Sequence, residues 1–245
     1  NVYVCLDLSG EPLYRRGYRL SGGAAPMRET LAAVLIQLMQ WKRKIPLHDA
    51  FCGSGTIPIE AAWYAYNIPP GIARHFAFEN FICFEKEKIE AVLKEEKERA
   101  ASEVRTDCLA RITGSDISEE AVSLSKANAE RACIIAGREL HAAGITHHIE
   151  RPDFIQSDFS ELEAPYESGI LLSNPPYGER LGSEEEAFEL YKRMAEIPQH
   201  FPDWKLGFIT SKKEFEKIFC KQNKDAVLKK HSLRGGNMET VLYIM

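Results

Sequence analysis

Short apolar runs alternate with longer stretches of helical period along most of this chain. The apolar runs predict strands over 47–51, 110–116, 149–157, 169–173 and 205–210. Between and around them, apolar positions three and four apart predict helices over 30–40, 56–66, 86–99, 119–136, 185–196 and 212–220. Strands that alternate with helices are typical of a parallel sheet covered on both faces.

The two ends of the chain follow a different pattern. Near the C-terminus, the pattern predicts two strands, over 226–231 and 240–245, without a helix between them. This favours an antiparallel hairpin at the edge of the sheet. Residues 1–20 alternate around Ser9-Gly10-Glu11-Pro12 and predict a separate β-hairpin. We therefore expect an α/β fold with a mostly parallel seven-stranded sheet over 21–245, preceded by this N-terminal hairpin.

Composition narrows the class of protein. The 245 residues are 44% hydrophobic and 27% charged, which excludes disordered, collagen-like and coiled-coil chains. No apolar run approaches the ~20 residues of a membrane span. Six cysteines are scattered without CxxC pairs, so we expect neither a metal site nor a disulfide framework, and a cytoplasmic location.

Charge is distributed unevenly. The whole chain carries −5, but the stretch Lys212–Arg234 holds eight lysines and arginines against three acids. A basic stretch on an acidic body suits contact with nucleic-acid phosphates. The alternative is that these residues form ordinary solvated faces of a helix and a strand, and the charge pattern does not separate the two.

The first candidate site is the turn after the strand at 47–51. A glycine turn between a strand and a helix lets the backbone approach a ligand, as in dinucleotide-binding folds. Pro58 stands where the pyrophosphate fingerprint needs its third glycine, and no lysine follows the glycines as in a P-loop. The carboxylate of Asp49 would repel phosphate but suits an ammonium group, so the segment favours the methionine end of S-adenosylmethionine over a plain structural turn. The candidate residues are Asp49, Phe51, Cys52, Gly53, Ser54, Gly55 and Thr56.

Acidic residues also end the next two predicted strands. Asp116 suits the two hydroxyl groups of a ribose, while Ser118 is the better N-cap of the following helix. Asp158 suits an adenine amino group, with Ile117 or Phe159 packed on the ring. A lone aspartate after a strand is usually a turn residue. We include Asp158 in the candidate site only because the ends of the earlier strands are expected to border the same crevice.

The fourth strand leads into the most specific motif, Asn174-Pro175-Pro176-Tyr177. Two prolines fix φ and remove two backbone donors, and they keep Asn174 out of helical geometry. The carboxamide oxygen of Asn174 and the carbonyl of Pro175 then become two rigid acceptors beside the aromatic ring of Tyr177. This arrangement suits the amino group of a nucleobase. The alternative is that the motif has only a structural role, as a rigid loop at the end of a strand.

Together, DAFCGSGT, GSDIS, QSDF and NPPYG resemble a class I S-adenosylmethionine-dependent methyltransferase of the amino-group type. APMRETLAA, GSGTIPIEAA and NPPYGERLG narrow the resemblance to the bacterial ribosomal RNA guanine-N2 methyltransferases, whose relatives are often labelled N6-adenine-specific DNA methylases.

The resemblance implies a Rossmann-like fold, S-adenosylmethionine as cofactor and ribosomal RNA as partner. It also implies that Arg28, Glu29 and Thr30 fold back over the cofactor, and that a THUMP RNA-binding domain lies upstream of residue 1. In that case residues 1–20 are the connection to it.

Three functions compete at this point. The favoured one is methylation of guanine N2 in 23S ribosomal RNA, by direct transfer that needs alignment more than a strong base. The second is methylation of adenine N6 in DNA, since NPPY serves both bases. The third is a non-catalytic nucleic-acid-binding module, against which the intact Gly53, Gly55, Asp116 and Asn174 count.

Overall fold

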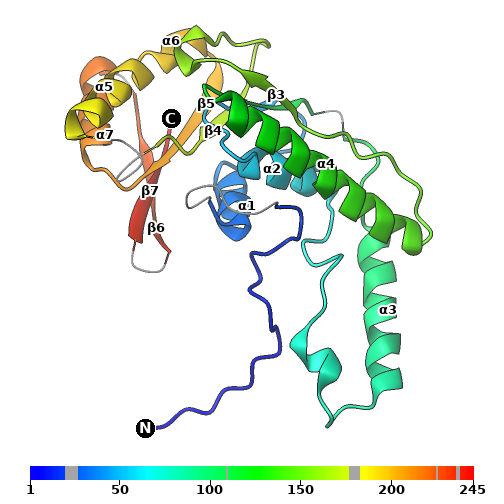
Figure 1. Cartoon of the computed structure of the whole chain (residues 1–245). Helices are drawn as coiled ribbons and strands as arrows, with labels where there is room; N and C mark the ends of the chain where they lie inside the picture. Colours follow the sequence, from blue (N-terminus) through cyan, green and yellow to red (C-terminus); the bar gives the residue numbers. More distant parts are fainter. Residues whose placement is uncertain (20–26, 109, 177–182, 225, 236–237) are drawn as a thin grey trace.

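A seven-stranded sheet forms the centre of the molecule in this computed structural model (Figure 1). The structure describes residues 1–19, 27–108, 110–176, 183–224, 226–235 and 238–245. The strand order is β3-β2-β1-β4-β5-β7-β6. In chain order the strands are β1 (Leu47–Asp49), β2 (Ile112–Asp116), β3 (Asp153–Gln156), β4 (Gly169–Ser173), β5 (Trp204–Thr210), β6 (Lys229–Gly235) and β7 (Met238–Ile244).

The pairing of the strands confirms the predicted fold class. β1 to β5 are parallel, whereas β7 pairs antiparallel with both β5 and β6. The two closing strands therefore form the predicted edge hairpin. The chain order reverses between β1 and β4, so the carboxyl ends of these strands flank the crevice in which open α/β sheets bind ligands.

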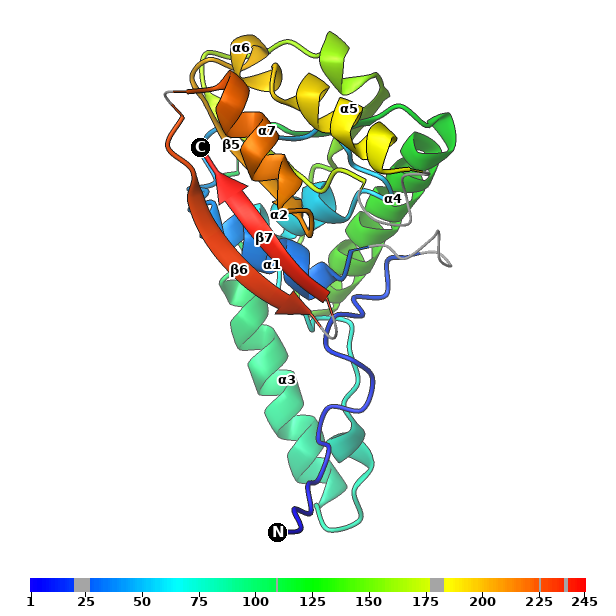
Figure 2. The same cartoon turned by 90° about the vertical axis from the view of Figure 1, so that its left-hand side faces the viewer.

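The chain forms seven described helices, and all of them except α3 lie against the sheet or its covering helices (Figures 1 and 2). They are α1 (Glu29–Leu38), α2 (Thr56–Tyr66), α3 (Lys86–Ser102), α4 (Glu119–Ala142), α5 (Glu184–Met194), α6 (Ile197–His200) and α7 (Glu214–Gln222), with 3-10 turns η1 (Ala77–Asn80) and η2 (Phe159–Glu161). Every predicted helix is present, although α4 extends six residues beyond the predicted end because its buried stripe continues to Leu140.

The sheet is buried on both faces, which explains its nearly continuous apolar strands. In β4, Leu171 packs into the cluster formed by α5 and α7, while Ile170 and Leu172 pack into the cluster formed by α1 and α2. Burial of a large aliphatic side chain contributes about 1.5–3 kcal/mol. Helices on both faces therefore hold the strand ends, and the side chains that follow them, in fixed positions.

The predicted N-terminal β-hairpin is wrong. The described residues 1–19 contain no strand, and Val2 and Val4 are more than nine-tenths exposed. The local turn forms differently, because the carboxylate of Asp7 accepts a hydrogen bond from the backbone N–H of Ser9 at 2.8 Å. A two-stranded hairpin is marginally stable at best unless another layer buries its apolar face. The alternating pattern does not show that such a layer exists, and residues 1–19 form no hairpin.

The end of this segment nevertheless docks tightly on α2. Tyr18 is buried and donates its hydroxyl hydrogen to Glu60, 3.1 Å away. Arg16 forms an ion pair with the same carboxylate at 3.3 Å. Burial is the main cause that raises the pKa of Glu60, and the arginine opposes it. Residues 16–19 are therefore an integral part of the domain rather than a linker.

Helix α3 projects away from the sheet together with the N-terminal segment (Figures 1 and 2). The structure describes the whole of this helix, and Ala101 is its only buried residue, so the predicted solvated charged face is confirmed. None of the described helices has both the length and the apolar composition that a membrane span requires. No cluster of side chains suited to a metal ion occurs in the described ranges.

Gly55 offers a test of the turn that starts α2. Its φ is +81°, and an added Cβ would lie 2.9 Å from the Cβ of Ser125. We expect Gly55→Ala to lower the free energy of unfolding by about 1–3 kcal/mol, measured by urea denaturation. Gly137→Ala is the control, because Gly137 lies inside α4 with no atom near the added methyl, and it should be neutral or stabilising. Equal stability of the two variants would contradict the strain at Gly55.

Candidate functional site

Two adjoining cavities lie at the carboxyl ends of the parallel strands. The β1 cavity, of about 480 Å³, is lined by Asp49, the glycine turn, the start of α4 and Asn174. The β3 cavity, of about 310 Å³, is lined by residues that follow β2, β3 and β4. Phe51, Gly53 and Asn174 line both cavities. The structure thus brings together side chains from positions 49 to 176 that the sequence placed at separate strand ends.

The glycine turn is held by its neighbours on both sides. The backbone N–H of Ala50 donates to the hydroxyl of Ser173 in β4 at 2.8 Å. The backbone N–H of Gly53 donates to the carboxylate of Asp116 in β2 at 2.9 Å. The positive φ of Gly53 and Gly55 lets the chain turn sharply between these two anchors. The turn is therefore fixed from both β2 and β4.

Asp49 lies at the bottom of the β1 cavity. Its side chain is 1% exposed and accepts a hydrogen bond from the backbone N–H of Phe51 at 3.1 Å. Burial raises the pKa of this carboxyl group to about 7, which outweighs the opposing effect of its hydrogen bonds. A buried carboxylate without an ion-pair partner is costly, and a cationic ligand group would relieve that cost.

Asp116 has a structural role that the sequence did not predict. One carboxylate oxygen accepts from Gly53, and the other accepts from the backbone N–H of Ser118 at 3.0 Å. Ser118 caps α4 by accepting from the N–H of Ala121 at 3.2 Å, as predicted. Each oxygen of Asp116 keeps a further acceptor position, and the residue lines the β3 cavity.

Aromatic and aliphatic side chains form the walls of the β3 cavity. The rings of Phe51 and Phe159 lie 4.9 Å apart, and Ile117, which directly follows Asp116, is more than half exposed. Asp158 follows β3 and also lines the cavity. These are the residues predicted for an adenine ring, and the structure brings all of them together.

Arg193 is a residue of this cavity that sequence reasoning missed. It comes from α5, and its guanidinium donates to the two carboxylate oxygens of Asp158 at 2.7 and 2.8 Å. The same group lies 4.8 Å from the centre of the Phe159 ring. Burial alone would raise the pKa of Asp158, but the hydrogen bonds from Arg193 and Ser160 together outweigh it and lower that pKa. No local pattern marks Arg193, because its partners are more than 30 residues away.

Asn174 lies where the two cavities meet. Its carboxamide oxygen is buried, and it has no hydrogen-bond partner within the described part of the chain. Pro175 is buried and Pro176 lines the β3 cavity. Tyr177 lies outside the described residues. A buried acceptor without a donor costs about 1–3 kcal/mol, so the site retains an acceptor that a ligand can satisfy.

Arg28, Glu29 and Thr30, where α1 begins, lie outside the two cavities. Arg28 is exposed and stacks on the ring of Tyr14 at 5.1 Å. Glu29 is buried and faces Arg19 at 3.5 Å.

Met27 and Arg19, which precede α1, connect the N-terminal part of the chain to the site. Met27 lines the β1 cavity. Arg19 donates to the backbone carbonyl of Met27 at 2.7 Å and to the hydroxyl of Thr56 at 2.9 Å. Arg19 therefore ties the N-terminal segment to the first residue of α2, which sequence reasoning also missed.

Comparison with known proteins gives the family. The family described as RMKL-like, methyltransferase domain, matches residues 16–242. "Putative RNA methyltransferase YpsC" of Bacillus subtilis is 35% identical over 240 residues, which are 98% of this chain and 57% of that protein. The ribosomal RNA large subunit methyltransferase K/L of Shewanella pealeana is 37% identical over 86% of this chain, but that match covers only 28% of the relative. The chain thus spans about half of the first relative and less of the second.

Solved structures agree with this result. The crystal structure of SMU.472 complexed with SAH superposes with a TM-score of 0.77 at 31% identity, over 97% of this chain and 56% of that one. A structure from Listeria monocytogenes, described as a "predicted N6-adenine-specific DNA methylase", gives 0.76 at 33% identity over 97% and 56% of the two chains. These matches confirm the class I methyltransferase fold, and the SAH bound to SMU.472, which is the product form of S-adenosylmethionine, agrees with the predicted cofactor. The chain belongs to the RMKL-like methyltransferase domain family.

Proposed function

We propose that this chain transfers a methyl group from S-adenosylmethionine to the exocyclic N2 of a guanine in 23S ribosomal RNA. One observation carries the proposal: the carboxamide oxygen of Asn174 is buried at the junction of the two cavities and has no hydrogen-bond partner among the described residues. An acceptor in that position suits an amino group that donates two hydrogens, next to a cofactor that spans both cavities.

In this proposal the β1 cavity holds the methionine end of the cofactor. Asp49 is a buried acceptor for its ammonium group, and the turn from Cys52 to Thr56 lets the backbone approach the ligand. An added Cβ at Gly53 would meet no atom within 4 Å, so the cavity is open above this glycine. The residues that line this cavity therefore fit the methionine end of S-adenosylmethionine, the cofactor that the family implies.

The β3 cavity holds the nucleoside end. Asp116 accepts hydrogen bonds from the ribose hydroxyls with the lone pairs that its two backbone partners leave free. The adenine ring packs against Ile117 and Phe159. Asp158 retains acceptor capacity for the adenine amino group beside its ion pair with Arg193.

The cofactor, when bound, supplies an electrophilic methyl group on a sulfonium. The protein aligns the acceptor with it, and such alignment accounts for up to ~7–11 kcal/mol of a barrier. The acceptor amine is a weak nucleophile because its lone pair is delocalised into the base. Asn174 and the carbonyl of Pro175 accept its two hydrogens and stabilise the positive charge that develops on nitrogen. Tyr177 stays a prediction as the ring that stacks on the flipped base.

The choice of ribosomal RNA rests on the relatives. Two of them carry RNA or large-subunit ribosomal RNA in their names, and the guanine assignment rests on the motif resemblance. The basic stretch Lys212–Arg234 runs through α7 and β6, where Lys230 pairs with Glu216 at 2.5 Å. We propose that its remaining exposed lysines contact RNA phosphates and that an upstream THUMP domain adds further RNA contacts.

Substrate class can be decided by one assay. Tritiated S-adenosylmethionine is offered with large-subunit ribosomal RNA or with genomic DNA, and the product nucleosides are separated. We expect N2-methylguanosine from the RNA. Label in N6-methyladenine from DNA would instead favour the activity for which the Listeria protein is named. If calorimetry detected no binding of S-adenosylmethionine, the remaining candidate function would be a non-catalytic nucleic-acid-binding module.

Cofactor affinity should depend on pH through Asp49. The pKa of this group is about 7 in the free protein, and the ammonium group of the ligand needs the ionised form. As pH falls below 7, binding must first remove a proton, so the Kd should rise about tenfold per pH unit. Calorimetry between pH 5 and 7 measures this. Asp49→Asn should bind weakly with a flat profile, and a flat profile in the wild type would remove Asp49 from the ammonium site.

Arg193 should contribute to binding of the nucleoside end. Arg193→Gln removes the ion pair with Asp158 and the cover over Phe159, and we expect the Kd for S-adenosylmethionine to rise about 3- to 20-fold. Arg138→Gln on α4 is the matched control, because Arg138 is exposed and pairs only with its neighbour Glu139 in the described structure. Equal affinity of the two variants would show that Arg193 is only a surface residue.

Asn174 should act on the rate rather than on cofactor binding. Its contacts strengthen as charge develops on the acceptor nitrogen, so Asn174→Ala should keep the Kd for S-adenosylmethionine and lower kcat about 100- to 1000-fold. Single-turnover methylation of saturating RNA measures this. Asn174→Asp keeps an oxygen acceptor and should retain partial activity. A wild-type rate in Asn174→Ala would make the NPPY loop merely structural.

A further inference from the structure

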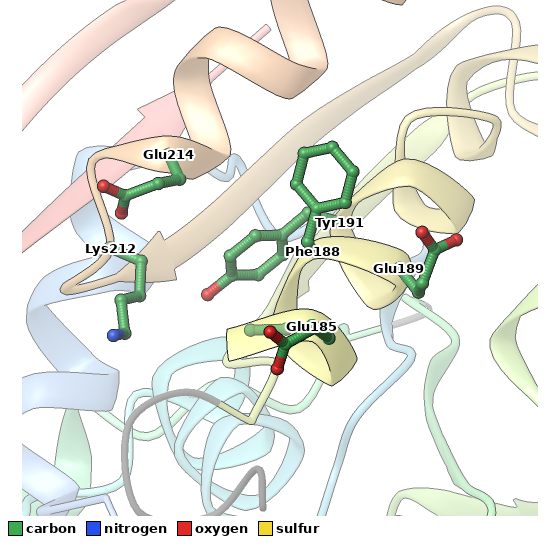
Figure 3. Close-up of a pocket in the computed structure, with 7 residues that line it drawn as sticks. Glu185, Phe188, Glu189, Tyr191, Lys212 and Glu214 are labelled. Atoms are coloured by element: carbon green, nitrogen blue, oxygen red, sulfur yellow. The ribbon is translucent and has the colours of Figure 1, made fainter. Parts of the chain in front are cut away.

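A third cavity lies beside the site, between α5 and the start of α7. Its volume is about 400 Å³, and its lining is Glu185, Ala187, Phe188, Glu189, Tyr191, Lys212 and Glu214. Figure 3 shows the two walls: Lys212 comes from the connection after β5, Glu214 is the first residue of α7, and the other labelled residues come from α5. None of these residues lines the β1 or β3 cavity.

The position of this α5–α7 cavity follows from the strand order. Along the carboxyl edge of the sheet, β3, β2 and β1 carry the residues proposed for adenine, ribose and methionine, and β4 carries Asn174. β5 comes next, with Ser173 in register with Phe208. An acceptor must approach the methyl group from the side opposite to the sulfur. With the cofactor oriented as proposed, the cavity at the end of β5 therefore lies on the side of the acceptor.

The cavity is built before any ligand binds. Thr210, the last residue of β5, is 1% exposed, and its hydroxyl lies 3.1 Å from the hydroxyl of Tyr191. The backbone N–H of Lys212 donates to the same oxygen at 3.1 Å. The ring of Tyr191 also packs edge-on against Phe215 in α7. One buried threonine thus joins the α5 wall to the α7 wall.

The polar groups of the lining indicate what kind of ligand fits. Glu189 pairs with Lys192 at 2.7 Å, whereas Glu185 and Glu214 have no hydrogen-bond or ion-pair partner among the residues that the structure places. Carboxylates only accept hydrogen bonds and repel phosphate, while Lys212 only donates. The ligand edge must therefore present donors to a carboxylate and an acceptor to a lysine.

Phe188 supplies a surface for stacking. It is 46% exposed at the cavity, and Lys192 lies 4.3 Å from its ring centre. Half-exposed aromatic rings beside acceptor groups are how proteins hold unstacked bases of single-stranded RNA. A guanine combines N1–H and N2–H donors with an O6 acceptor, which matches a carboxylate and a lysine together. Uracil, with two carbonyl groups around one donor, matches less well.

We propose that the α5–α7 cavity binds a second nucleobase of the substrate, a guanine near the methylated nucleotide, by stacking on Phe188 and hydrogen bonding to Glu185 or Glu214 and Lys212. The inference rests on the proposed nucleic-acid substrate. It adds a site that selects the sequence around the target and takes no part in the transfer itself.

The test measures binding without methyl transfer. The protein saturated with S-adenosylhomocysteine is titrated with GMP, AMP, CMP and UMP and followed by saturation-transfer NMR, in the Asn174→Ala background, which removes one of the two acceptors proposed for the target amine. GMP should give the strongest signal and UMP the weakest. Phe188→Ala and Glu214→Gln should each lower the GMP signal at least threefold, with melting temperatures unchanged.

Matched controls come from the projecting segment. Phe84→Ala removes an equally exposed aromatic ring beside α3, and Glu87→Gln neutralises an exposed carboxylate on it. Both should bind GMP like the parent protein. Unchanged GMP binding in both cavity variants, or UMP bound as well as GMP, would overturn the inference. A wild-type KM for RNA in Phe188→Ala and Glu214→Gln would overturn it too while leaving the proposed function intact, whereas GMP binding without any RNA methylation would overturn only the proposed function.

Discussion

Two hydrogen bonds hold the turn after β1, and the rest of the site depends on them. The N–H of Ala50 donates to Ser173 in β4, and the N–H of Gly53 donates to Asp116 in β2. Ser173 directly precedes Asn174, so one contact couples the glycine turn to the NPPY motif. The other couples the same turn to the carboxylate proposed for the ribose. The two cavities therefore keep a fixed relation to each other, which is the preorganisation that direct transfer requires.

The site also retains two groups that a purely structural core would avoid. Asp49 is buried without an ion-pair partner, and the oxygen of Asn174 is buried without a hydrogen-bond donor, within the described residues. Each costs stability in the free protein. The apolar clusters on both faces of the sheet offset that cost, because they fix the strands on which these residues sit. A ligand that brings a cationic group to Asp49 and a hydrogen-bond donor to Asn174 would relieve both costs, and the free energy of binding would become more favourable.

The sequence predicted the strand ends well, because parallel strands place their carboxyl ends on one edge and the motifs stand at those ends. The cap at Ser118 and the start of α2 at Thr56 follow from local rules and agree with the structure. The N-terminal hairpin failed because an alternating pattern says nothing about whether a partner layer exists. Arg193 and Arg19 escaped notice because their roles arise from contacts between distant segments, which local periodicity does not contain. Arg28 was assigned by resemblance, and the structure places it on Tyr14.

The orientation of the cofactor is the central claim, and a crystal structure of this chain with S-adenosylhomocysteine tests it most directly. We expect the amino group on Asp49, the ribose on Asp116 and the adenine between Ile117 and Phe159. The sulfur should face the carboxamide oxygen of Asn174. Adenine bound against Phe188, or a sulfur directed away from Asn174, would contradict it.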